Sequence, residues 1–235
     1  SLTNSNRPTL SGVAEAGSTV SILEGGTTLG QATVGVNGAY SLVVATMADG
    51  SHTLRAKATD DAGNISSAST ALVVVVDTVD PAVPTLTGTS PSSTSTPVIS
   101  GVAEANATVT ILAGGQALGQ ATADAGGNYT FTPGSPLGDG THLLSATATD
   151  AAGNTGTASA VFSLLIDTGV PGSPVLSVTP SITNDNTPLV GGTAESGATI
   201  SIYSGNTLLG PPVEANGGGI SFIPTTALSD GTYVL

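Results

Sequence analysis

The chain has no cysteine and no tryptophan, and charged residues make up only 8% of its 235 positions. Without cysteine, neither disulfides nor thiolate metal sites can form, so a secreted domain of this composition needs a different cross-link. Calcium, bound by hard oxygen ligands, is the usual one. No apolar run reaches the ~18 residues that a membrane-spanning helix needs, so we expect no membrane insertion in this segment.

Basic residues are scarce as well. Sixteen acidic residues face three basic ones, which gives a formal net charge of −13. All three basic residues, Arg7, Arg55 and Lys57, lie in the first third of the chain. Phosphate binding needs clustered lysine and arginine, so we expect no nucleic-acid partner.

Glycine and small β-formers are abundant. The chain has 32 glycines and is rich in valine, threonine, serine and alanine, while aromatic residues make up only 3%. This composition favours strands and turns over helices. A core built without large aromatic side chains is thin, which suits several small β-sandwiches better than one large globule.

Internal repetition is the strongest signal in the sequence. Ser11–Ile22 (SGVAEAGSTVSI), Ser100–Ile111 (SGVAEANATVTI) and Gly191–Ile202 (GGTAESGATISI) are variants of one segment. A second shared segment is ATDDAGN at 58–64 and ATDAAGN at 148–154. An aspartate-glycine pair follows the same order, at Asp49, Asp139 and Asp230. The spacing of about ninety residues is a length typical of β-sandwich domains.

The repeats predict three domains, called repeats 1, 2 and 3 below. Repeat 1 covers residues 1–77 and lacks a first strand, and repeat 2 covers residues 78–167 and is complete. Repeat 3 covers residues 168–235 and stops inside its sixth strand, because Leu235 aligns with Leu144. The predicted fold class is all-β, with tandem seven-stranded β-sandwiches. Because an odd number of strands separates the two ends of a domain, we expect a head-to-tail rod.

Alternation of apolar and polar residues divides repeat 2 into seven predicted strands. They cover residues 84–88, 97–104, 108–112, 117–123, 129–132, 141–149 and 158–166. In the sixth strand, His142, Leu144 and Ala146 are predicted to face the core. Gly114 and Gly115 predict a hairpin between the third and fourth strands.

Acidic residues gather at the predicted joint between repeats 1 and 2. Asp77 and Asp80 follow a run of β-branched residues in LVVVVDTVDPAVP, and strand counting places them beside Glu104 and Asp150. Four converging carboxylates would repel one another unless a cation neutralised them, and Ca²⁺ takes six to eight such oxygen ligands. For each acid alone, capping of a turn is an equally good interpretation. For Asp124, which has no acidic counterpart in repeat 1, the turn is the preferred interpretation.

The second joint repeats this pattern incompletely. Asp167 and Glu195 are kept, but Val170 stands where the first joint has Asp80. We therefore expect a weaker calcium site and a looser joint.

The motifs that carry the repeat resemble a known family. The DTxxPxxP linkers, the TPxxxGxAExxxxVxI segment and the ATDxAGN turn are similar to bacterial immunoglobulin-like tandem repeats of large secreted adhesins and biofilm-associated surface proteins. The resemblance covers essentially the whole chain. It implies calcium at the joints between domains, neighbouring repeats of the same chain as partners, and a secreted, cell-surface location. By motif, the calcium ligands would be Asp77, Glu104 and Asp150 at the first joint and Asp167 and Glu195 at the second.

The predicted function is a calcium-stiffened spacer that projects a distal binding domain, which would contact a host or abiotic surface. An enzyme is not expected, because His52 and His142 share one repeat position and are predicted to be core residues. The alternative is a glycan- or protein-binding module of a secreted protein. It would need exposed aromatic residues, whereas Tyr40, Tyr129, Phe131 and Tyr203 are predicted to pack inside the domains.

Overall fold

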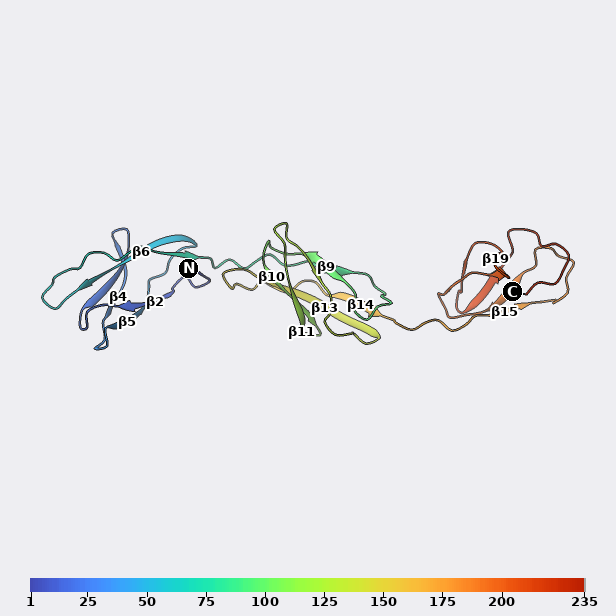
Figure 1. Cartoon of the computed structure of the whole chain (residues 1–235), viewed down its shortest axis with the longest axis horizontal. Coiled ribbons are helices and arrows are strands. Elements are labelled where there is room, and N and C mark those ends of the chain that lie inside the picture. Colours follow the sequence, from blue (N-terminus) through green and yellow to red (C-terminus); the bar gives the residue numbers. More distant parts are fainter. Residues whose placement is uncertain (235) are drawn as a thin grey trace. The chain divides into compact units, whose positions relative to one another are not determined.

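The computed structural model describes residues 1–234, and every regular element in that range is a β-strand (Figure 1). Leu235, where the sixth strand of repeat 3 was expected to stop, lies outside the described residues. The chain forms two compact units, Ser1–Thr168 and Gly169–Leu235. The first unit holds repeats 1 and 2 and the second holds repeat 3, and each repeat has its own hydrophobic core. The domain boundaries at residues 77 and 167 stay predictions.

Repeat 2 is a sandwich of two antiparallel sheets. In spatial order, one sheet consists of β11 (Gln116–Thr122), β10 (Thr108–Ala113), β13 (Gly140–Thr149) and β14 (Phe162–Ile166), and the other of β12 (Asn128–Phe131), β9 (Ile99–Val102) and β8 (Thr87–Gly88). All seven strands predicted from the sequence are therefore confirmed. The first is shorter than expected, because the segment before Thr87 joins the sheet through the isolated hydrogen bond from Thr85 N to Val102 O.

The core of repeat 2 lies between its two sheets. Along β13, Leu144, Ala146 and Ala148 are fully buried, while the residues between them are partly exposed. Ile99 and Leu164 close the core from the two sheets, and both have no exposed surface. The predicted alternation along 141–149 is confirmed, because successive side chains of a strand point to opposite faces.

The hairpin between β10 and β11 turns at Gly114 and Gly115. Ala113 pairs with Gln116 across it, and the two glycines have φ angles of 56° and 84°. A two-residue turn with both φ angles positive matches the twist of the flanking strands, and glycine adopts it without steric cost. The hairpin predicted at these two residues is confirmed.

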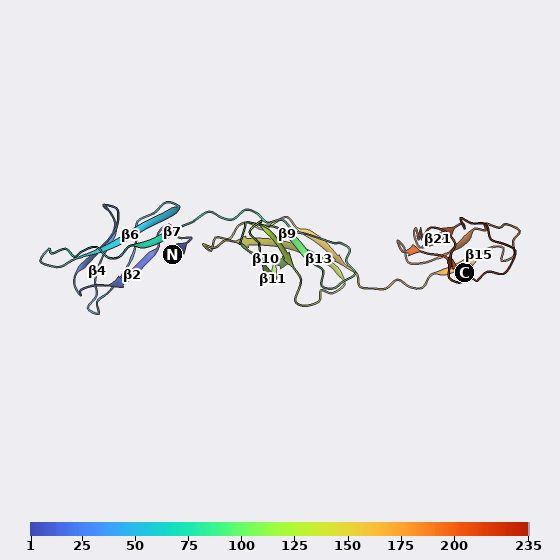
Figure 2. The same ribbon diagram turned by 45° about the horizontal axis from the view of Figure 1, so that its top comes forward.

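Repeat 1 has the same two layers, with one difference at its edge. One sheet consists of β1 (Leu2–Thr3), β7 (Leu72–Val76), β6 (Gly50–Thr59), β3 (Thr19–Glu24) and β4 (Thr27–Thr33), and the other of β2 (Thr9–Val13) and β5 (Ala39–Val43). Leu2 and Thr3 pair in parallel with β7, and Figure 2 shows the N-terminus beside that strand. In repeat 2, Ser92 forms the same parallel bridge with Ile166.

Repeat 3 forms a smaller set of sheets. They pair β15 (Val175–Val178), β16 (Val190–Thr193) and β21 (Gly219–Phe222), then β17 (Thr199–Ile200) with β20 (Val213–Glu214), and β18 (Tyr203–Ser204) with β19 (Thr207–Leu208). Its core is built around Val190, Ile202 and Phe222. The packing of Tyr203 that was expected from the sequence is wrong. Its side chain is 47% exposed, because it points away from the core into which the preceding residue, Ile202, points.

Candidate functional site

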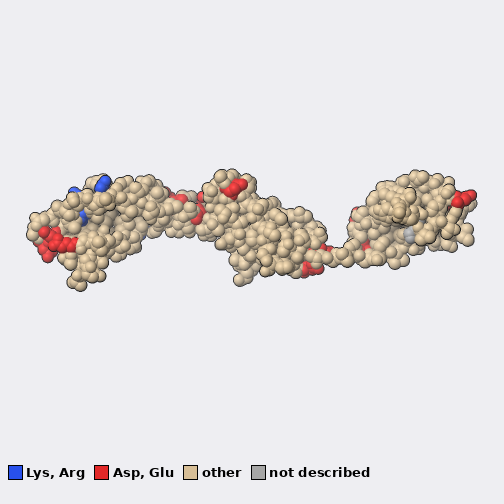
Figure 3. Space-filling model, viewed as in Figure 1, with Lys and Arg blue, Asp and Glu red and all other residues tan. Residues whose placement is uncertain are grey.

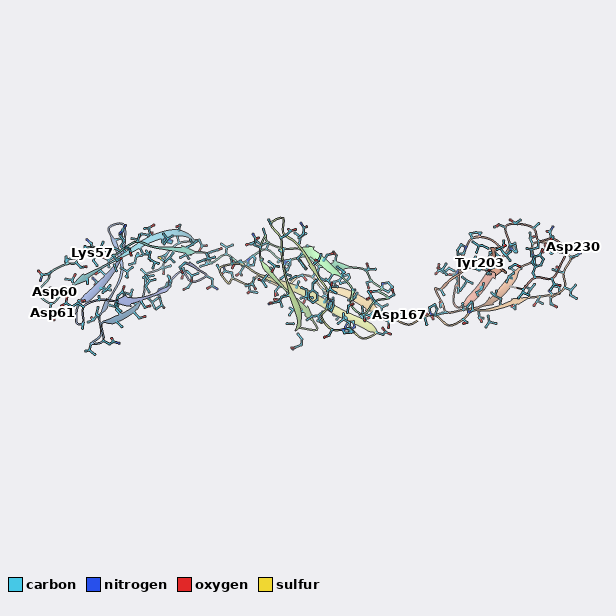
Figure 4. The ribbon with its side chains drawn as sticks, in the orientation of Figure 1. Lys57, Asp60, Asp61, Asp167, Tyr203 and Asp230 are labelled. Carbon is cyan, nitrogen blue, oxygen red and sulfur yellow. The ribbon has the colours of Figure 1, made fainter. Side chains whose placement is uncertain are left out.

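The acidic residues lie in small separate groups on the face drawn in Figure 3. The three basic residues belong to repeat 1. In Figure 4, Asp60 and Asp61 lie together at one end of that repeat, close to Lys57. Several acidic residues occupy the same position in more than one repeat, and their hydrogen bonds show which of them support the fold.

Asp139 binds the segment that leaves repeat 2. Its Oδ1 accepts hydrogen bonds from the backbone nitrogen of Thr168 at 3.0 Å and from the Thr168 hydroxyl at 2.8 Å. Asp139 directly precedes β13, while Thr168 follows β14, which pairs with β13. The carboxylate therefore fixes the end of the last strand to the start of its neighbour.

Asp49 of repeat 1 makes the same contact with Thr78, the first residue after that repeat. Asp49 Oδ1 accepts hydrogen bonds from the nitrogen and the hydroxyl of Thr78, at 3.0 and 2.9 Å. The sequence marked Asp49 and Asp139 as a repeated aspartate-glycine pair, but it did not assign their partners. The signal was available, because in both repeats the threonine of the DT linker follows the aspartate by 29 residues.

Asp150 closes the turn between β13 and β14. Its Oδ1 accepts hydrogen bonds from the backbone nitrogens of Gly153 and Asn154, and its Oδ2 accepts one from the Asn154 side chain at 2.8 Å. Partial burial acts to raise the pKa of Asp150, but the hydrogen bonds from Asn154 and Gly153 outweigh it and hold the pKa below its ordinary value. In repeat 1, Asp60 makes the same turn with Asn64, whose hydrogen bonds lower the pKa of Asp60.

The joint between repeats 1 and 2 is made by Asn154. Its Nδ2 donates a hydrogen bond to the backbone carbonyl of Asp77 at 2.8 Å, in addition to the one to Asp150. Asn154 is only 8% exposed, whereas the equivalent Asn64 lies at the surface. The structure therefore places the linker that begins at Asp77 against the turn at 150–154, as predicted. The side-chain amide of Asn154 makes the direct contact.

The carboxylates expected at this joint have separate roles. Asp77 Oδ1 accepts a hydrogen bond from the Val79 nitrogen at 3.2 Å, and the side chains of Asp80 and Glu104 are exposed. Within residues 1–234, no group of three or more His, Asp or Glu residues is close enough to hold a metal ion. The predicted convergence of four carboxylates is therefore not found, because Asp150 turns its oxygens toward its own loop. Calcium binding at this joint stays a prediction.

The residues predicted for the second joint belong to different compact units. Asp167 is the second-last residue of the first unit, and its position is labelled in Figure 4. Its backbone nitrogen donates a hydrogen bond to the Ser92 carbonyl at 2.9 Å. Glu195 is exposed in the second unit, in the turn where its carbonyl accepts a hydrogen bond from the Ala198 nitrogen. A shared site for these two residues stays a prediction.

Asp124 is a turn residue, as the sequence indicated. Its Oδ1 accepts hydrogen bonds from the backbone nitrogens of Gly126 and Asn128, both at 2.8 Å. The hydrogen bond from the Asn128 backbone is the main cause of a lowered pKa at Asp124. This carboxylate therefore supports the turn before β12.

The two histidines lie at one repeat position on the predicted inner face of their strands, where they pair with the buried Val74 and Leu164, but they are partly exposed and so lie at the margin of the core. Each has Nε2 2.8 Å from the carbonyl four residues earlier, Ala48 for His52 and Gly138 for His142. Each is the third residue of its strand, β6 or β13. His52 also contacts Glu24, whose Oε1 is 2.9 Å from Nδ1. Hydrogen bonding to Ala48 and Glu24 raises the pKa of His52 above 6.5, against an opposing effect of burial.

The remaining aromatic predictions are confirmed. Tyr129 and Phe131 are buried in the core of repeat 2, and Tyr40 packs at the edge of the core of repeat 1. Among the labelled residues of Figure 4, Tyr203 lies on repeat 3, where its ring is exposed.

A family model described as a bacterial Ig-like domain matches residues 1–78 and again residues 86–168. The chain belongs to the bacterial Ig-like domain family. The two matches follow one another along the chain, which establishes a tandem array of immunoglobulin-like sandwiches. A comparison with curated proteins finds no significant match. No helix in the described part of this bacterial Ig-like chain is long and apolar enough to cross a membrane.

Solved structures provide more distant likenesses. The BSP domain of a biofilm-associated protein is 21% identical over 72% of this chain and 29% of its own, with a TM-score of 0.31. A putative membrane-anchored protein from Corynebacterium diphtheriae is 11% identical over 84% of this chain and 59% of its own, with a TM-score of 0.32. The bacterial Ig-like chain therefore spans less than two thirds of either structure.

Proposed function

We propose that this chain is a spacer segment of a secreted adhesin on the bacterial cell surface. In this proposal, its repeats join head to tail as a stalk and project a binding domain located elsewhere in the polypeptide. Its partners are the neighbouring Ig-like repeats of the same chain. The distal domain makes the contact with a host or abiotic surface.

One observation carries the proposal: the acidic residues that recur between repeats hold the sandwich and its linker. Asp49 and Asp139 each bind the threonine that begins the next linker. Asp60 and Asp150 each close the turn before the last strand. Residues that recur for structural reasons are typical of an array whose purpose is its length, since a catalytic group needs to occur only once.

Calcium is the second part of the proposal. Its support is the sequence pattern, with Asp77, Asp80, Glu104 and Asp150 around the first joint and a net charge of −13 with few basic residues to balance it. A divalent cation that binds oxygens from both sides of the linker would reduce the repulsion between them. Since Asp150 already accepts three hydrogen bonds, binding there would require its carboxylate to share or exchange them.

Small-angle scattering and thermal melting test both parts together. We expect the full chain in calcium to give an extended scattering profile, and excess chelator to increase its flexibility and lower its melting temperature. Calorimetric titration with calcium should give a saturable signal that is weakened in Asp77→Ala. Unchanged melting and scattering in chelator, with no calorimetric signal, would remove calcium from the proposal. A compact scattering profile in both conditions would contradict the spacer itself.

A binding module remains the second candidate because of Tyr203. Its exposed ring on β18 is the kind of surface on which a sugar stacks, although a glycan site usually combines several aromatic residues. A glycan array probed with the intact chain separates the two functions. We expect no saturable signal, and a signal that Tyr203→Ala abolishes would favour the binding module.

A further inference from the structure

Both ring nitrogens of His52 face hydrogen-bond acceptors. Nδ1 lies 2.9 and 3.1 Å from the two carboxylate oxygens of Glu24, the last residue of β3, and Nε2 lies 2.8 Å from the Ala48 carbonyl oxygen. An imidazole ring donates from both nitrogens only when it is protonated, because the neutral ring carries a single N–H. The arrangement around His52 therefore fits the charged ring, and neither neutral tautomer satisfies both contacts.

His142 occupies the same position in repeat 2 but has only one acceptor. Its Nε2 lies 2.8 Å from the Gly138 carbonyl oxygen, and within the described residues its Nδ1 has no hydrogen-bond partner. Ala113, the last residue of β10, stands there in place of Glu24. A neutral ring with its proton on Nε2 makes this single contact as a charged ring does. The contact of His142 therefore needs no charged ring, whereas the two contacts of His52 together do.

Few charged groups surround His52. β3 contributes Glu24, whose side chain is 37% exposed, while that of His52 is 14% exposed. β7, which pairs with β6 beside His52, has no charged residue. The segment before β6 contributes Asp49, whose carboxylate is directed at the linker, and its Val44 carbonyl accepts a hydrogen bond from Arg7. Glu24 is therefore the charged group that decides where a neutral ring keeps its proton.

Loss of one proton from His52 forces a choice between its two contacts. With the remaining proton on Nε2, the Nδ1 lone pair would face the Glu24 carboxylate. With that proton on Nδ1, the Nε2 lone pair would face the Ala48 carbonyl. A hydrogen bond to an ionised acceptor is roughly twice as strong as one to a neutral acceptor. The neutral ring therefore keeps its proton toward Glu24, and the Ala48 carbonyl loses its donor.

The Ala48 carbonyl belongs to the peptide unit that leads into Asp49. Asp49 in turn holds the linker, since its Oδ1 accepts hydrogen bonds from the nitrogen and the hydroxyl of Thr78. Met47 is anchored separately, because its side chain is buried and its nitrogen donates to the Asn6 carbonyl. The histidine contact therefore acts on the last two residues before β6, and one of these residues holds the linker.

We propose that His52 is a pH-sensitive clamp on the linker between repeats 1 and 2. When protonated, the ring connects the Glu24 carboxylate to the Ala48 carbonyl. Asp49 is then kept in place to bind Thr78. When the ring loses its proton, Asp49 and the start of the linker gain freedom. The clamp acts without a metal ion, so it is separate from the calcium proposed for the joint.

The direction of the effect follows from the folded-state pKa of His52. The Ala48 carbonyl and then Glu24 act to raise that pKa above 6.5, with burial opposing them. The clamp is therefore closed below about pH 6.5 and opens as the pH rises through the folded-state pKa. In repeat 2 the equivalent contact needs no charged ring, so the hold of Asp139 on Thr168 should not change over this range.

Heteronuclear NMR of the imidazole nitrogens in the intact chain tests the protonation step. In mildly alkaline solution the neutral His52 should carry its proton on Nδ1, while His142 carries it on Nε2. The chemical shifts of the ring nitrogens distinguish these two tautomers. Glu24→Ala gives repeat 1 the residue of repeat 2, so His52 should change there to the Nε2–H tautomer. A neutral His52 with its proton on Nε2 in the unaltered chain would overturn the proposal.

Hydrogen exchange of the Thr78 amide tests the coupling to the linker. Its protection factor should fall about fivefold as the pH rises from about 5.5 to about 8, as expected for the loss of one hydrogen bond. The protection factor of the Thr168 amide should stay constant, which makes repeat 2 an internal control. Glu24→Ala should remove the pH dependence at Thr78. The reciprocal Ala113→Glu should create it at Thr168, and this variant leaves repeat 1 unaltered.

Two results of the exchange experiment would also overturn the proposal. One is a Thr78 protection factor that follows that of Thr168 over the whole pH range, because the ring would then not act on the linker. The other is a pH dependence at Thr78 that persists in Glu24→Ala, because a group other than the histidine–carboxylate pair would then cause it.

Discussion

Asp139 accepts two hydrogen bonds from Thr168, one from its backbone and one from its hydroxyl, although 29 residues separate the two in sequence. Asp49 and Thr78 repeat the contact in repeat 1. The contact joins the start of one strand to the end of the next, at the point where the chain leaves the sandwich. It therefore couples the stability of the domain to the order of the linker.

Removal of this contact should destabilise repeat 2 modestly. We expect Asp139→Ala to lower its free energy of unfolding by about 1 kcal/mol, since hydrogen bonds to an exposed carboxylate are weakened by solvent. The amide of Thr168 should also exchange faster with solvent. Chemical denaturation and hydrogen exchange measure the two effects. Thr168→Ser keeps both donors and is the matched control, and an equal loss in that variant would contradict the assignment.

The Asp150–Asn154 turn should lose stability in acid. Hydrogen bonds hold the folded-state pKa of Asp150 below its ordinary value of 3.8, so they stabilise the fold above that pH. The contribution disappears as the pH falls through the folded-state pKa. Asn154→Ala should raise the pKa of Asp150 toward 3.8, as carboxyl NMR titration would show.

The same substitution should free the linker, because Asn154 also binds the Asp77 carbonyl. Relaxation measurements on the Val79 amide should report larger motions in Asn154→Ala. Asn64→Ala changes the equivalent exposed turn of repeat 1 and serves as the control. If both variants change the Val79 amide equally, the amide contact does not order the linker.

The alternation along β13 gives a test of the core. Leu144 has no exposed surface, while Leu143 next to it is 57% exposed. We expect Leu144→Ala to lower the free energy of unfolding of repeat 2 by about 2–5 kcal/mol. Leu143→Ala should change it by less than about 0.5 kcal/mol, as for most surface positions. If the two variants lost similar amounts of unfolding free energy, Leu144 would not be on the buried face of the sheet and Leu143 on the exposed one.

His52 should make the stability of repeat 1 depend on pH near neutrality. The Ala48 carbonyl and then Glu24 act to raise its pKa above 6.5, with burial opposing them. A raised pKa stabilises the folded state below about pH 6.5, and this stabilisation is lost as the pH rises through the folded-state pKa. Proton NMR should show the His52 pKa falling in Glu24→Gln. No change in that variant would assign the shift to the carbonyl contact alone.

The strands and hairpins of the domains could be predicted because they depend on local patterns in the sequence. Period-two alternation located β13, and paired glycines located the hairpin at Gly114 and Gly115. The direction of a side chain next to a break in the ladder is harder to predict. Tyr203 occupies the position of Leu112, but the sheet of repeat 3 is divided into short pairs there, and the ring turns outward.

The joint shows which part of a site strand counting can place and which part it cannot. Counting strands correctly brought the turn at Asp150 to the linker at Asp77. Which atoms come into contact depends on the rotamers of individual side chains. The Asp150 carboxylate points into its own turn because it accepts hydrogen bonds from the nitrogens of Gly153 and Asn154. The amide of Asn154 then faces the linker, and a pattern of acids alone does not contain that information.

The parallel contact between an early segment and the last strand, found in repeats 1 and 2, has a mechanical consequence. In repeat 2, Ser92 bonds to the main chain of Leu165 and Asp167, and in repeat 1, Ser1 and Thr3 bond to Val75 and Asp77. A tensile force along the polypeptide pulls these two adjacent parallel segments in opposite directions, so it loads their hydrogen bonds in shear. Bonds loaded in shear must break together, whereas a hairpin pulled open at its end loses them one by one. Single-molecule stretching should therefore find a higher rupture force for repeat 2 pulled through its linkers than for the same repeat pulled across the β10–β11 hairpin.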